Sequence, residues 1–157
     1  MVFPPVHPIF VNFTAALVPA SFFSDAMARL LRRKSLASAG WWVLLYATLA
    51  TPITVITGWY WFRQMGQSDD PGTMATMAIH KWLGGGLAIA FLGLLYWRWR
   101  FFRSGNAPGW VYLACIGCTV AALVIQGHLG GAMSFVADVQ ATGNSIVLAL
   151  PNRSAPV

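Results

Sequence analysis

The stretch WVYLACIGCTVAALVIQGHLGGAMSF, residues 110–135, decides the fold of this chain. It contains no Asp, Glu, Lys or Arg, and it exceeds the roughly 20 apolar residues that a transmembrane helix needs. Hydrocarbon offers no hydrogen-bond partners to a backbone, so a segment of this kind must satisfy its own polar groups as a helix. The stretch therefore predicts one membrane-spanning helix.

Three further apolar stretches precede it, at about residues 8–31, 41–62 and 74–97. The whole chain has 157 residues, of which 57% are hydrophobic and 9% are charged, whereas soluble domains average about 25% charged residues. This composition excludes an ordinary soluble enzyme and a disordered tail. We expect an all-α integral membrane protein, a single four-helix bundle over residues 1–157, with residues 136–157 as a tail outside the membrane.

The basic residues predict the orientation of the bundle. Two clusters lie between the first and second stretches and between the third and fourth: Arg29, Arg32, Arg33 and Lys34, then Arg98, Arg100 and Arg103. Because basic loops stay in the cytoplasm, both termini are expected on the outer side, the periplasm in a bacterial inner membrane. The net charge of +6 does not indicate nucleic-acid binding, since both clusters lie where the topology alone requires them.

The three histidines of the chain are His7, His80 and His128. His7 precedes the first stretch, His80 lies near the start of the third, and His128 lies near the end of the fourth. The predicted topology brings all three to the outer leaflet. Ionisable groups in a membrane span are costly, so such residues are candidates for function.

Each of the two histidines inside the later spans has a glycine about one turn away, Gly84 near His80 and Gly131 near His128. A flat macrocycle needs such a clearing beside its ligand. We therefore predict one haem b held by His80 and His128, with His7 and His80 as the alternative pair. Otherwise His7 is a candidate to hydrogen-bond a haem propionate or a quinone. The simpler interpretation is that small residues pack membrane helices and a buried histidine is only a hydrogen-bond partner.

Asp25 lies four residues before Arg29, and this spacing predicts an ion pair within one helix. Zinc is disfavoured as a ligand of the histidines, because two imidazoles without a nearby cysteine or carboxylate fall short of a tetrahedral site.

Two motifs resemble a bacterial family of four-helix membrane proteins known only as a domain of unknown function. The segment HPIFVNFTAAL, residues 7–17, resembles the family's opening HPxxVHFP, and GHLGG at 127–131 resembles the end of its fourth helix. The resemblance extends from His7 to Phe135. It implies a cytochrome-b-like module that works beside periplasmic cytochromes c or dehydrogenases. Asn12 and Thr14 replace a histidine and a proline of the pattern, so a second haem is not expected.

These observations lead to two functional hypotheses. The first is a haem-b subunit that carries electrons between a quinone pool and a periplasmic redox partner, within an oxidoreductase or a respiratory or photosynthetic assembly. The second is a haem-free structural or anchoring subunit of a larger membrane complex. The sequence shows no nucleophile–base pair, so the chain is not expected to be an enzyme by itself.

Overall fold

The computed structural model describes residues 6–64 and 71–149, with side chains for 6–63 and 71–133. Four helices make up these ranges: α1 Val6–Leu30, α2 Lys34–Gln64, α3 Pro71–Ser104 and α4 Trp110–Ala149. No strand occurs within them, and all four helices are long and apolar enough to cross a membrane. The predicted four-helix membrane bundle is confirmed.

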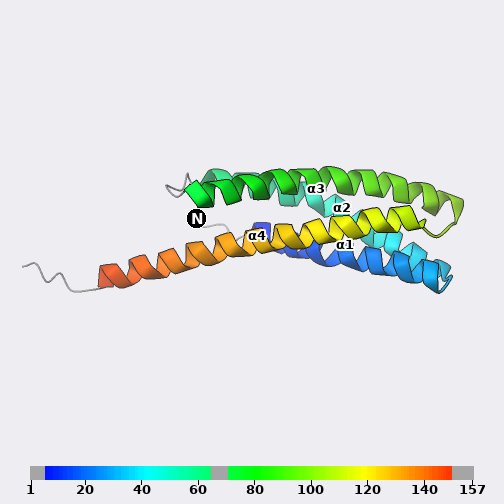
Figure 1. Cartoon of the computed structure of the whole chain (residues 1–157), viewed down its shortest axis with the longest axis horizontal. Coiled ribbons are helices and arrows are strands. Elements are labelled where there is room, and N and C mark those ends of the chain that lie inside the picture. Colours follow the sequence, from blue (N-terminus) through cyan, green and yellow to red (C-terminus); the bar gives the residue numbers. More distant parts are fainter. Residues whose placement is uncertain (1–5, 65–70, 150–157) are drawn as a thin grey trace, which may run out of the picture.

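The helices run alternately up and down (Figure 1), and the contacts between neighbouring helices close into a ring. Helix α1 packs against α2 and α4, and α3 packs against the same two helices. Among the described residues, α1 and α3 make no backbone contact and face each other diagonally. This arrangement creates two distinct ends, which we call the basic end (residues 25–41 and 98–112) and the histidine end (the start of α1, the end of α2 and the start of α3).

Polarity is distributed as expected for a protein in lipid. Large apolar side chains point outward, and Ile89 and Trp82 are 73% and 71% exposed. Polar side chains lie inside instead, including Thr14, Ser21 and Asp25. Lipid tails are as apolar as these outer side chains, so an exterior of this kind is stable only in a bilayer.

Tight turns shape the basic end. The α1–α2 connection is residues 31–33, in which Arg32 adopts a left-handed φ of 53°. The N–H of Arg33 bonds back to the carbonyl of Ala28 at 3.1 Å, as in a Schellman helix cap. Gly105, with φ 67°, ends α3 in a similar way. These turns bring the end of α1 beside the second loop, where Arg29 donates a hydrogen bond to the carbonyl of Pro108.

The observed α4 is longer than the sequence pattern predicts, because it continues beyond residue 135 to Ala149. No proline occurs in residues 136–150, so nothing in that stretch obliges the helix to stop before Pro151. At 40 residues it measures about 60 Å, roughly twice the hydrocarbon thickness. Its last part extends past the other helices in Figure 1. Residues 150–157 of the expected tail lie outside the described ranges.

Two apolar clusters fill the bundle between its ends. One surrounds Leu44, Tyr112 and Ile116 near the basic end, and the other surrounds Val18, Leu87 and Phe91 toward the histidine end. These layers separate the polar groups of one end from those of the other.

Candidate functional site

A cavity of about 130 Å³ lies at the histidine end, enclosed by all four helices. Helix α1 contributes His7 and Thr14, and α3 contributes His80 and Lys81. Gly58 of α2 and the polar side chain of Gln126 of α4 also line the cavity. Leu87 and Phe91 of α3 form an apolar part of its wall. The two histidines therefore reach one space from helices that face each other diagonally.

His7 lies in the first turn of α1, and its ring is held against α2. The Nδ1 atom lies 3.1 Å from the carbonyl oxygen of Thr54 and 3.2 Å from the Thr57 hydroxyl. A carbonyl only accepts, so Nδ1 carries the proton and Nε2 keeps its lone pair. Gly58 makes room for this ring, since a Cβ there would lie 2.8 Å from the His7 Cε1.

His80 packs its ring against the opposite side of the cavity. A Cβ at Gly130 would lie 3.1 Å from the His80 Cε1, so this glycine of α4 accommodates the ring. The backbone carbonyl of His80 accepts a hydrogen bond from Nε2 of Gln126 at 2.9 Å. The contact fixes the position of this turn of α3 relative to α4.

Three buried polar atoms that belong to residues of this cavity have no hydrogen-bond partner among the described residues. They are Nδ1 of His80, Oγ1 of Thr14 and Oε1 of Gln126. Buried polar atoms are nearly always bonded, and several unpartnered ones in one place indicate a ligand or ordered water. The cavity is therefore a candidate binding site.

Lys81 supplies the positive charge of this cavity. Its Nζ lies 4.9 Å from the ring centre of Trp59 and 5.1 Å from that of Phe62, within cation–π range. The ammonium is thus held beside the cavity by aromatic faces, where it can meet an anionic group that enters.

The structure does not bring His80 and His128 into one site. His128 and Gly131 are exposed and do not line the cavity, whereas Gly84 does. The reason is helical register: Gln126 faces inward, and a residue two positions further is rotated by about 200°. The alternative pair, His7 and His80, is the one that shares a cavity.

The donor set at this cavity fits a haem better than a free metal ion. No group of three or more His, Cys, Asp or Glu residues occurs in the described part of the chain, so a bare ion would lack ligands. A porphyrin supplies four nitrogens and needs only two axial imidazoles. The volume is the unfavourable feature, since 130 Å³ is less than the roughly 300–1,000 Å³ of pockets for larger ligands. A haem would require α1 and α3 to move apart.

The basic end contains a buried ion pair that the sequence pattern misses. Asp25 accepts hydrogen bonds from Nε and Nη2 of Arg98, both at 2.9 Å, and the side chains are 0% and 1% exposed. Gly40 leaves room for the carboxylate, and Arg98 also donates to the carbonyl of Ala37. The ion pair connects α1 with α3, and the hydrogen bond to Ala37 connects Arg98 to α2 as well.

The predicted pair between Asp25 and Arg29 is therefore wrong. Arg29 instead donates to the carbonyl of Pro108 at 3.1 Å and lies over the Trp110 ring at 4.9 Å. Intrahelical spacing favours Arg29, but Asp25 faces the bundle interior, where only Arg98 reaches it. The sequence does contain a signal for the observed pair. Asp25 lies inside one span, and Arg98 lies between two tryptophans at the same depth of another span.

The chain belongs to the family described as "Predicted membrane protein (DUF2231)", whose family model matches residues 3–143. No curated protein and no solved structure matches it. The family description states a membrane location and no activity, so the function must be argued from the residues themselves.

Proposed function

We propose that this chain is a membrane electron-transfer protein that binds one haem b at the histidine end, where His7 and His80 would hold it. The observation that carries the proposal is that these two imidazoles, from diagonally opposed helices, line one cavity between the four helices at the histidine end. Helix bundles hold cofactors between facing side chains in this way.

The hydrogen bonds of His7 support a role as a ligand. Its Nδ1 proton is donated to a backbone carbonyl, that of Thr54, which fixes the tautomer and leaves Nε2 free to bind iron. His80 supplies the second ring, and its buried Nδ1 has no hydrogen-bond partner among the described residues that a ligand would have to displace.

Lys81 and the glycines have supporting roles. Lys81 is placed to pair with a propionate, and Gly84 and Gly85 leave the α3 backbone open toward the cavity. A Cβ at Gly85 would meet nothing within 4 Å, and at Gly84 it would meet only the flexible end of Gln126. The space needed for a porphyrin can therefore come from side-chain movement together with separation of α1 and α3.

A haem held by both imidazoles would supply electron transfer rather than oxygen chemistry. The histidine end lies opposite the basic end, so the positive-inside rule places the cavity toward the periplasm. We infer a periplasmic redox partner, a cytochrome c or a dehydrogenase, and a quinone pool as the membrane partner.

A second candidate is a haem-free structural or anchoring subunit. Two observations favour it: the small volume of the cavity and the part of α4 that extends beyond the bundle toward the histidine end, where another subunit could pack. The two candidates differ in one measurable property, the presence of haem.

The test is a reduced-minus-oxidised absorption spectrum of protein purified from haem-replete cells. We compare the unchanged chain with His7→Ala, His80→Ala and, as a matched control, His128→Ala. Loss of a ligand removes the iron–imidazole bond, so we expect at least about tenfold less haem in the first two variants. The exposed His128 should be replaceable without loss.

Circular dichroism and size exclusion establish that each variant is folded. Absence of a haem band in folded, unchanged protein would favour the structural subunit. A band that is lost in His128→Ala and kept in His7→Ala would restore His80 and His128 as the ligand pair.

A further inference from the structure

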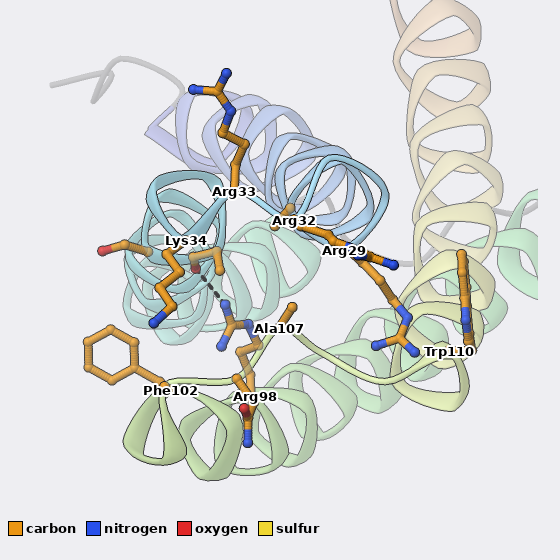
Figure 2. A pocket seen from close by; sticks show the side chains of 13 residues that line it. Arg29, Arg32, Arg33, Lys34, Arg98, Phe102, Ala107 and Trp110 are labelled. Carbon is orange, nitrogen blue, oxygen red and sulfur yellow. Dashed lines mark hydrogen bonds between the residues drawn. The ribbon is translucent and has the colours of Figure 1, made fainter.

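A second, larger cavity of about 590 Å³ lies at the basic end, on the opposite side of the apolar core from the histidines. It is bounded by the end of α1, the start of α2, the end of α3 and the loop that leads into α4. Figure 2 shows Arg29 beside Trp110 on one side of this space and Lys34 on the other, with Arg98 between them. Five basic residues line it: Arg29, Arg32, Arg33, Lys34 and Arg98.

The cavity carries a strong excess of positive charge. Asp25 neutralises Arg98, but no other acidic residue occurs in residues 25–41 or 98–112, which form this end. The other four basic residues of the cavity therefore have no acidic partner within those segments. Charges of one sign around a low-dielectric hollow concentrate the potential that attracts an anion.

Two helices begin at this cavity. Helix α2 starts at Lys34 and α4 at Trp110, and both residues line the space. The first N–H groups of a helix have no intrahelical acceptor and can donate to an anion, while the dipoles of α2 and α4 are offset by those of α1 and α3, which end at the same cavity. The free N–H groups are suited to phosphate oxygens.

Buried donors without partners provide an independent observation. Arg98 is 1% exposed, lines the cavity, and has no hydrogen-bond partner for its Nη1 among the described residues. The buried Nε of Arg29 likewise has none. Two guanidinium groups with unused donors at one cavity indicate a missing acceptor, because buried donors are normally satisfied.

We propose that this cavity binds a phosphate group, with the headgroup of an anionic phospholipid as its source. Arginine forks and helix N-termini together match phosphate oxygens. Trp110 and Phe102 line the same space and are exposed, so acyl chains could lie against them while the headgroup enters. The volume exceeds what a lone phosphate needs. Basic pockets between membrane helices on the cytoplasmic side bind anionic headgroups in this manner. The inference is independent of the haem proposal.

The experiment measures lipid retention by native mass spectrometry. Delipidated full-length protein is mixed with equal amounts of dioleoylphosphatidylglycerol and dioleoylphosphatidylcholine, and the ratio of the two bound species is recorded. The test variant is Arg32→Gln/Lys34→Gln, which removes two exposed charges that line the cavity. The matched control is Arg100→Gln/Arg103→Gln, which removes two exposed charges of the same end that do not line it.

We expect the unchanged protein and the control to prefer phosphatidylglycerol, and the test variant to lose at least about tenfold of that preference. A second arm titrates inorganic phosphate into protein in phosphatidylcholine nanodiscs and follows the melting temperature. Binding in the lipid arm alone identifies a lipid headgroup, and a phosphate-dependent rise in melting temperature alone identifies a soluble phosphate compound. Either result supports the site only if Arg32→Gln/Lys34→Gln abolishes it and the control does not.

Equal loss in test and control variants would overturn the proposal, because it would show a general effect of charge. An absence of selective binding in both arms would also overturn it. If the double variant does not fold, Arg29→Gln provides a second test, with Arg100→Gln as its single-charge control. Circular dichroism of all variants keeps loss of binding distinct from loss of structure.

Discussion

At the basic end, the buried carboxylate of Asp25 receives two charge-assisted hydrogen bonds from Arg98, whereas the histidine cavity contains no ion pair among the described residues and three of its buried polar atoms have no partner there. The same bundle thus encloses polar groups in two different ways. The ion pair satisfies its acid completely and ties three helices together. The histidine cavity leaves acceptor and donor capacity unused. Both ends have buried polar atoms without a partner among the described residues, so the difference between them is the ion pair, which gives the basic end a cohesion that the histidine end lacks.

Breaking the ion pair should have the largest effect on stability. Arg98→Met keeps much of the side-chain volume but leaves the charge of Asp25 buried without a partner. We expect the free energy of unfolding to fall by about 3–5 kcal/mol. The measurement is a denaturant titration in detergent, with Arg100→Met, at an exposed position of the same helix, as the control. A loss no greater than that of the control would mean that the pair does not hold this end together.

A methyl group at Gly58 should have the next largest effect on stability, and it should disturb the packing of the histidine end only. A Cβ at this position would lie 2.8 Å from the His7 Cε1, so the ring must move away from the Thr54 carbonyl. We expect Gly58→Ala to cost about 1–3 kcal/mol of unfolding free energy and to weaken haem binding.

The control for Gly58→Ala is Gly86→Ala, where a Cβ meets nothing within 4 Å. Because alanine is a better helix residue than glycine, this control should be neutral or more stable by about 0.5–1 kcal/mol. Equal behaviour of the two variants, in the same denaturant titration, would contradict the tight fit of His7.

The smallest predicted effect on stability is the difference between removing two buried hydroxyl groups of α1. Ser21 donates to the carbonyl of Gly40 at 2.8 Å, whereas Oγ1 of Thr14 has no partner among the described residues. Ser21→Ala should therefore cost about 1 kcal/mol, and Thr14→Val should be close to neutral. Melting curves of haem-free protein measure both. A cost for Thr14→Val that equals that of Ser21→Ala would show that the cavity already satisfies this hydroxyl, for example through water.

The sequence predicts the four helices and their grouping into two ends because long apolar runs and loop charges act locally along the chain. The contacts across the bundle depend on how each helix is rotated, which periodicity determines only weakly when nearly every residue is apolar. For this reason the sequence could not show that the side chain of His128 is exposed, outside the cavity that His80 lines. Likewise Asp25 was assigned to Arg29 in its own helix, although its partner is Arg98 on another. The extension of α4 was missed because hydropathy marks the end of a span and not the end of a helix.

The ion pair also has a consequence for the order of biosynthesis. Asp25 and Arg98 are separated by 73 positions in the chain. At 5–20 residues per second, the ribosome needs roughly 4–15 s to reach Arg98 after it has made Asp25. During that interval α1 and α2 can insert, but the carboxyl group has no arginine to bind and must stay protonated or hydrated near the headgroups. The Asp25–Arg98 pair can therefore form only after α3 has been made. Its formation marks the packing of α3 against the hairpin of α1 and α2.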